Sequence, residues 1–147
     1  PDRMLLDLLR EDLRVCDAKE GCAAGDCGAC TVVIADTVDG EHLDFRSINS
    51  CIRPAHAIHG MALWTAADLA QEGMLHPAQA AIVQRHGTQC GFCTPGVVMS
   101  LFSLYQRTCA QSEELQKSHV IDALSGNLCR CTGYTPIVQA VMEVANA

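Results

Sequence analysis

The sequence has few positive charges and no long apolar run. Lysine and arginine together number 10 against 17 acidic residues, a formal net charge of −7, and no basic stripe could neutralise a run of phosphates. No nucleic-acid partner is therefore expected. The longest uninterrupted apolar run has four residues, whereas a membrane-spanning helix needs about 20. We therefore expect a soluble protein without a membrane partner.

The start of the chain also lacks the pattern of a secretory leader. Charged residues interrupt the apolar ones, and no long apolar segment leads to a small-residue cleavage site. We therefore expect the protein in the cytoplasm. Its 147 residues suffice for one ordinary domain or for two small ones.

Ten cysteines are the feature that most needs a cause. Disulfides, zinc and iron–sulfur clusters are the alternatives. A disulfide framework serves chains that are too small to bury a core, whereas 49% of these residues are apolar and many fall in amphipathic stretches. This composition disfavours disulfides, and the spacing of the cysteines must distinguish the metals.

The pattern of apolar residues divides the chain near Gly73. Residues 1–72 predict mixed α and β structure, and residues 73–147 predict a four-helix bundle. In the first part we expect a helix over residues 4–13 capped by Asp2, a loop over Gly21–Cys30, strands at Thr31–Ile34 and Leu43–Arg46, and a turn at Asp39-Gly40. In the second part we expect helices over Pro77–Gly87, Thr94–Tyr105, Val120–Leu124 and Thr135–Val144.

The first part contains four cysteines with the spacing C-x4-C-x2-C-x20-C, which are Cys22, Cys27, Cys30 and Cys51. This spacing is typical of plant-type 2Fe-2S ferredoxins, whereas structural zinc sites commonly use short C-x2-4-C pairs. A loop around a cluster needs positive φ angles and close backbone approach, which Gly21, Gly25 and Gly28 would allow. The pattern therefore predicts a 2Fe-2S cluster.

The second part contains four further cysteines with the spacing C-x2-C-x35-C-x-C, which are Cys90, Cys93, Cys129 and Cys131. Both pairs come just before predicted helix starts, where the helix dipole favours an anionic group. The spacing itself establishes only that four thiolates can converge. Zinc and an iron–sulfur cluster both remain open here.

Three segments resemble the signature segments of the iron–sulfur part of the molybdenum hydroxylases, the family of the xanthine dehydrogenases and aldehyde oxidoreductases. They are Lys19–Thr31, Gln89–Gly96 and Gly126–Tyr134. The resemblance covers nearly the whole chain, with the segments in the same order. Asn49–Cys51 and Leu75–Gly87 are most similar to the xanthine dehydrogenase branch.

The resemblance implies an α+β fold with two 2Fe-2S clusters, one in a ferredoxin-like β-grasp and one in the helical bundle. Electrons would pass from a molybdopterin centre through both clusters to FAD during purine hydroxylation. The resemblance puts Gln89 and Cys131 on the pterin side and Gly25 on the flavin side. FAD, molybdopterin and the substrate chemistry would belong to partner domains or chains of a hetero-oligomer, so no catalytic residue is expected here.

The chain departs from the family at its start. Family members begin with a β-hairpin before the first helix, so the β-grasp here is expected to be truncated or incomplete. Molybdenum hydroxylases of the aldehyde, carbon monoxide or isoquinoline type remain alternatives, as does a zinc-stabilised adaptor. Cys16 and Cys109 are expected to be small buried hydrophobes. Arg130 would either donate to a sulfur or carboxylate or face solvent.

Overall fold

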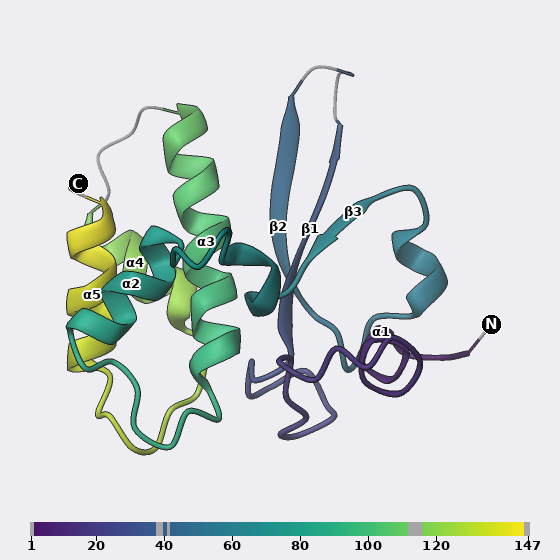
Figure 1. Cartoon of the computed structure of the whole chain (residues 1–147), viewed down its shortest axis with the longest axis horizontal. Coiled ribbons are helices and arrows are strands. Elements are labelled where there is room, and N and C mark those ends of the chain that lie inside the picture. Colours follow the sequence, from purple (N-terminus) through teal and green to yellow (C-terminus); the bar gives the residue numbers. More distant parts are fainter. Residues whose placement is uncertain (1, 38–39, 41, 112–115, 146–147) are drawn as a thin grey trace.

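A small antiparallel sheet lies between two groups of helical segments in the computed structural model, which describes residues 2–37, 40, 42–111 and 116–145 (Figure 1). Helices α2 to α5 lie on one side of the sheet and α1 on the other. The elements are α1 (Leu5–Asp7), the π-helical turn η1 (Leu8–Asp12), β1 (Thr31–Thr37), β2 (Leu43–Asn49), the 3-10 turn η2 (Ala55–Ile58), β3 (Ala62–Trp64), the 3-10 turn η3 (Ala66–Leu69), α2 (Pro77–Gln84), α3 (Thr94–Gln111), α4 (Lys117–Leu124) and α5 (Thr135–Ala145).

The sheet has the strand order β2-β1-β3, and β1 pairs antiparallel with both neighbours. Thr31 pairs with Asn49, and Val33 pairs with Trp64. The two predicted strands are confirmed and extend further than predicted, whereas β3 was not predicted. Of the predicted turn, Asp39 lies outside the described residues. The prediction of a mixed α and β chain is confirmed.

The central strand β1 is buried on both faces. Successive side chains of a strand point to opposite sides, so neighbouring residues of β1 enter different cores. Val33 packs into the core of the helices, which includes Val97 and Phe102. Its neighbour Val32 packs into a second core with residues of α1 and η1 such as Leu6. Burying each such side chain contributes about 1.5–3 kcal/mol, so the sheet stabilises both sides of the molecule.

The first helix is present, but its predicted cap is wrong. Met4, not Asp2, precedes the helix and makes no side-chain cap hydrogen bond. The first helical N–H groups find backbone acceptors instead: Leu5 donates to Arg53 O at 2.8 Å and Leu6 donates to Ser50 O at 3.0 Å. Because these carbonyls satisfy the free N–H groups of the helix start, α1 is joined to the turn that carries Cys51.

The starts of three predicted helices are confirmed at Pro77, Thr94 and Thr135. His76 caps α2, since its Nδ1 accepts the N–H of Ala78 at 3.2 Å. The helix α4 begins at Lys117, three residues before its predicted start. No helix in the described part of the chain is long and apolar enough to cross a membrane.

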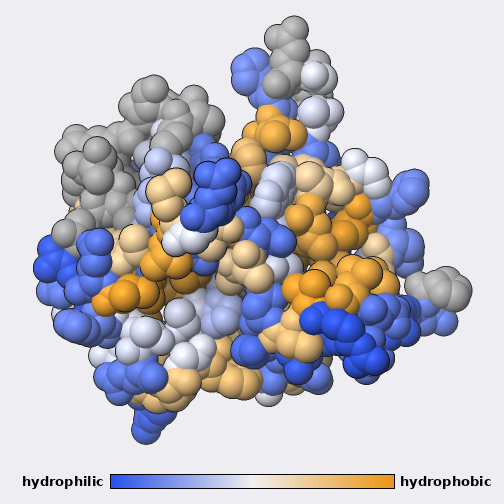
Figure 2. All heavy atoms as spheres, in the orientation of Figure 1, coloured by the Kyte–Doolittle hydropathy of each residue, from blue (hydrophilic) through white to orange (hydrophobic). Residues whose placement is uncertain are grey.

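Apolar side chains gather on the surface over β3 and α1 in the view of Figure 2. Large apolar residues are also exposed beside the cysteine loops, namely Ile52, Phe92, Leu128 and Tyr134. Contiguous exposed apolar surface often marks a contact site. These four residues could therefore contact a partner beside the cysteines.

Candidate metal centres

The loop that carries the first cysteines bends sharply at its glycines. Gly25 and Gly28 have φ angles of +81° and +70°, as predicted for a loop that wraps around a bound group. Gly21 has no positive φ, and it serves close approach instead: a Cβ there would lie 2.7 Å from Cys27 Sγ. The glycines of this loop therefore meet two different requirements.

Three backbone N–H groups surround the sulfur of Cys22. Those of Ala24, Asp26 and Cys27 donate to Cys22 Sγ at 3.4, 3.3 and 3.4 Å. These hydrogen bonds, that of Ala24 foremost, lower the pKa of the Cys22 thiol to about 6. A thiolate is the form that binds metal, so the folded loop favours the protonation state that a ligand needs.

Cys30, at the end of this loop, and Cys51, in the turn after β2, are both buried. Burial raises the pKa of Cys51 to about 12, and a hydrogen bond with the Cys30 thiol and the nearby charges of Cys30 and Cys22 add to this rise. Cys27 hydrogen-bonds Cys22, so all four cysteines of the first group come together. Thiolates this close repel one another, and a positively charged metal core relieves that repulsion.

The second group of cysteines also comes together. A pocket of about 580 Å³ is lined by Cys90, Cys93, Cys129 and Cys131. The thiols of Cys131 and Cys90 are 3.6 Å apart. Cys93 directly precedes α3, and Tyr134, which also lines the pocket, directly precedes α5, so two helix N-termini lie near the pocket, as predicted. Among the residues described, no three His, Cys, Asp or Glu side chains are spaced to hold one metal ion.

The thiols of this pocket influence one another as those of the first group do. Burial raises the pKa of Cys93 to about 12, with contributions from the Cys129 and Cys90 thiols. A hydrogen bond with Cys90 raises the pKa of Cys131. Burial alone would raise the pKa of Cys129, but hydrogen bonds led by that of the Thr132 hydroxyl, at 3.2 Å, lower it. The donor set is four soft sulfurs, which suits iron–sulfur or zinc.

Tyr134 supports the second loop, a role that the sequence did not indicate. Its hydroxyl oxygen accepts the backbone N–H of Cys129 at 3.0 Å. The residue has a φ of +68°, which is uncommon for a residue other than glycine. The strained backbone therefore coincides with a contact to a candidate ligand residue.

A backbone hydrogen bond connects the two groups of cysteines. The N–H of Leu128 donates to the carbonyl of Cys27 at 2.9 Å. Leu128 is bonded directly to Cys129. One hydrogen bond and a few covalent bonds thus separate a cysteine of the first group from a cysteine of the second.

The remaining predicted residues have less defined surroundings. Gln89 is exposed beside Cys90, and Arg130 is exposed on the wall of the 580 Å³ pocket. The carbonyl of Gly25 accepts a hydrogen bond from Asn49 Nδ2 at 2.5 Å. Cys16 is exposed, so its predicted burial is wrong: it lies in the turn after η1 rather than in a core. The side chain of Cys109 lies outside the described part of the chain.

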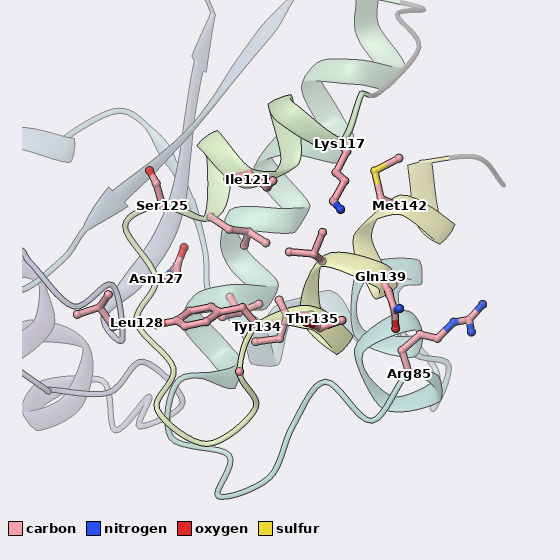
Figure 3. Close-up of a pocket in the computed structure, with 15 residues that line it drawn as sticks. Arg85, Lys117, Ile121, Ser125, Asn127, Leu128, Tyr134, Thr135, Gln139 and Met142 are labelled. Carbon is pink, nitrogen blue, oxygen red and sulfur yellow. The ribbon is translucent and has the colours of Figure 1, made fainter.

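A larger hollow, of about 1030 Å³, lies between α4 and α5 rather than at the cysteines (Figure 3). Ile121, Leu128 and Tyr134 line it, with Lys117 at one side. Leu128 and Tyr134 also line the cysteine pocket. The two hollows are therefore adjacent.

Two groups of four cysteine sulfurs, on glycine-rich and helix-flanked loops, are a donor set that an iron–sulfur or zinc protein would use. Two family models match: a 2Fe-2S iron–sulfur cluster binding domain over residues 1–56 and a 2Fe-2S binding domain over residues 65–142. The chain belongs to this family of 2Fe-2S binding domains and is the iron–sulfur part of the xanthine dehydrogenase and aldehyde oxidase group. The alternative of zinc in the second group is thereby set aside.

The chain resembles much longer enzymes. It is 44% identical over 141 residues to the xanthine dehydrogenase of Drosophila subobscura, a match that covers 95% of this chain and 10% of that protein. The identity is 43% to the xanthine dehydrogenase/oxidase of Rattus norvegicus, covering 99% of this chain and 11% of that protein, and 44% to aldehyde oxidase 1 of Cavia porcellus, covering 95% and 10%. The chain thus spans about a tenth of these curated relatives.

Solved structures agree with this assignment. Quinoline 2-oxidoreductase from Pseudomonas putida 86 matches with a TM-score of 0.84 and 35% identity, covering 100% of this chain and 84% of that one. The aldehyde oxidoreductase from Desulfovibrio desulfuricans matches with a TM-score of 0.83 and 35% identity, covering 99% of this chain and 15% of that one.

Proposed function

We propose that the chain is the electron-transfer part of a xanthine dehydrogenase, and that it passes electrons from a molybdopterin centre to FAD during purine hydroxylation. The observation that carries the proposal is the hydrogen bond from the Leu128 N–H to the Cys27 carbonyl at 2.9 Å. It joins two groups of thiols by a short bonded route. Each 2Fe-2S cluster, when bound, takes up and releases one electron at a time.

The proposed ligands are the two groups of four cysteines. The first comprises Cys22, Cys27, Cys30 and Cys51, and the second comprises Cys90, Cys93, Cys129 and Cys131. The three N–H groups around Cys22 Sγ support its role, because amides that donate to sulfur stabilise the more reduced, more negative state. The common pocket of the second group supports the other four.

We propose that residues 1–72 form a β-grasp and that residues 73–147 form a four-helix bundle. The turn at Gly73, which has a φ of +79°, supports a boundary there. The two cores on opposite faces of β1 support two structural halves.

The proposed partners are a flavin domain and a molybdopterin domain, on other parts of the enzyme or on other chains of a hetero-oligomer. Gly25 would face the flavin, and exposed Ile52 beside it supports a contact there. Gln89 and Cys131 would face the pterin, and exposed Phe92, which lines the 580 Å³ pocket with Cys131, supports a second contact. We propose a cytoplasmic location, because thiols that must bind metal need reducing surroundings.

Aldehyde oxidation is the second candidate. Aldehyde oxidase 1 of Cavia porcellus is 44% identical to this chain, the same value as the xanthine dehydrogenase of Drosophila subobscura. No substrate-contacting residue is proposed for this chain, so the choice depends on the partner domains. Anaerobic reduction of the complete enzyme by xanthine or by an aldehyde, followed as bleaching of the cluster absorbance, distinguishes the two.

Metal analysis and EPR test whether the chain holds two 2Fe-2S clusters, which together form the proposed electron relay. We expect about four irons and four sulfides per chain and no stoichiometric zinc, with two distinct signals after reduction. Cys22→Ser should remove or alter one signal, while Cys16→Ser, at an exposed cysteine outside both groups, should leave both unchanged. One iron–sulfur signal, or zinc in place of iron, would refute the relay.

A further inference from the structure

One buried amide links the two cysteine loops. Asn127 is 5% exposed. It lies on the segment between α4 and α5, at the side of the larger hollow in Figure 3. Its Nδ2 donates to Gly28 O at 3.1 Å and to Thr31 Oγ1 at 3.3 Å. Both acceptors directly follow cysteines of the first group, Cys27 and Cys30. A single side chain from the second loop therefore holds the first loop.

A serine of α3 fixes the orientation of this amide. The hydroxyl of Ser100, itself buried, donates to Asn127 Oδ1 at 2.6 Å. With its oxygen end occupied in this way, the amide must present its nitrogen to Gly28 and Thr31. Buried polar groups with every partner in place hold one geometry, so the amide is a rigid connection.

The backbones around the amide approach closely. A Cβ on Gly28 would collide with Gly126 O, and a Cβ on Gly96 at the start of α3 would collide with Gly28 O. Gly28 O also accepts the hydroxyl of Thr31 at 2.7 Å. Three segments thus meet at one carbonyl, and small shifts of one segment are transmitted to the others.

The general attachment of the two halves does not depend on Asn127. The helix α3 packs against β1 and β2 over a broad apolar surface. Ser103 on α3 also donates to Phe45 O in β2, at 3.3 Å. Loss of the Asn127 amide should therefore leave the halves together and release only the loops that carry the cysteines.

We propose that Asn127 is a positioning residue that fixes the separation and orientation of the two cysteine groups, and thereby sets the rate of electron exchange between the clusters they hold. The inference rests on the proposed function. Asn127 acts through Gly28 on one side and, two residues along the chain, through Cys129 on the other.

Three variants of the iron-loaded protein test this role. Asn127→Asp keeps the shape of the side chain and an acceptor for Ser100, but it lacks the N–H groups that reach Gly28. Ser100→Ala leaves Asn127 in place and removes the hydrogen bond that orients it. Ser103→Ala is the matched control, because it removes a comparable serine hydrogen bond between α3 and the sheet, one helical turn further from the cysteines.

The first measurement is the EPR spectrum of the fully reduced protein, in which two neighbouring paramagnetic clusters split each other's signals. The second is the rate at which an electron introduced by flash reduction redistributes between the clusters. We expect the splitting to change and the rate to fall in Asn127→Asp and Ser100→Ala, with both at wild-type values in Ser103→Ala and iron content unchanged. If Asn127→Asp does not bind iron, Ser100→Ala decides.

Wild-type splitting and rate in Ser100→Ala and in any iron-loaded Asn127→Asp would overturn the positioning role and leave the proposed function intact. Equal changes in Ser103→Ala would also overturn it, because they would indicate that general contact between the halves sets the geometry. Fewer than two iron–sulfur signals in the unaltered protein would contradict the proposed function itself.

Discussion

Replacement of Gly28 by alanine should destabilise the protein through two separable effects. The residue has a φ of +70°, which costs a residue with a Cβ roughly 1–2 kcal/mol. The new Cβ would also collide with Gly126 O and lie 2.6 Å from Asn127 Nδ2, and overpacking of this kind costs about 1–3 kcal/mol. The combined loss in the free energy of unfolding is therefore about 2–5 kcal/mol.

Thermal unfolding of the iron-loaded protein, followed by circular dichroism at one scan rate, measures this loss. For a chain of this size each kcal/mol lowers the midpoint by about 2–4 °C, so Gly28→Ala should melt about 4–20 °C below the unaltered protein. The cluster absorbance in the visible range, recorded in the same experiment, reports whether iron leaves before or with the fold.

Two further glycines separate the contributions. Gly60 has a φ of +82° but nothing within 4 Å of its Cβ position, so Gly60→Ala carries the backbone cost alone. Gly96 has no positive φ and lies in α3, where alanine is favoured by about 1 kcal/mol, yet its Cβ would collide with Gly28 O. Without the collision, Gly96→Ala should raise the stability of the protein. A net loss of stability would therefore show that the collision outweighs the gain in helix propensity. If Gly28→Ala melted no lower than Gly60→Ala, the close approach of Gly28 to Gly126 and Asn127 would add nothing to the loss of stability. That result would refute the prediction.

Two other predictions concern pH and metal. Burial lowers the pKa of His76 below its ordinary value of 6.5, so its uncharged form stabilises the fold above that pH and the stabilisation is lost as pH falls through the folded pKa. His76→Asn, which keeps a capping acceptor, should show a smaller loss of melting temperature between pH 7 and 5 than either the unaltered protein or His59→Asn. An equal loss would contradict this. Cys93→Ser should remove or alter the EPR signal of the second cluster, and an unchanged signal would remove Cys93 from the ligand set.

Much of the helical half could be predicted because its signals are local. Proline after a capping residue marks the starts at Pro77, Thr94 and Thr135, because the fixed φ of proline suits the first turn of a helix and its missing N–H is not needed there. The proximity of Cys22, Cys27 and Cys30 was likewise predictable, as was that of each cysteine pair in the second group, because these residues are close in sequence. The fold brings Cys51 to the first group and joins the two pairs of the second group, and the assignment of all eight cysteines as ligands stays a prediction.

Features that depend on distant partners could not be predicted. The short strand β3 exists because Val33 offers it a pairing edge, and Met4 replaces Asp2 at the helix start because carbonyls near Cys51 satisfy the free N–H groups. In the sequence, Asn127 was only one residue of the segment Gly126–Tyr134 and was assigned no role. Its function depends on an acceptor 99 residues away, and no periodicity indicates such a contact.

The position of β1 between two apolar cores affects how the protein unfolds and whether its halves can be separated. Val32 and Val33 are adjacent in sequence, yet each belongs to a different apolar cluster. Unfolding on either side must therefore withdraw support from the other, and melting should be a single cooperative transition. For the same reason the helical half cannot be excised or grafted as an independent module without a substitute for the face that Val33 provides.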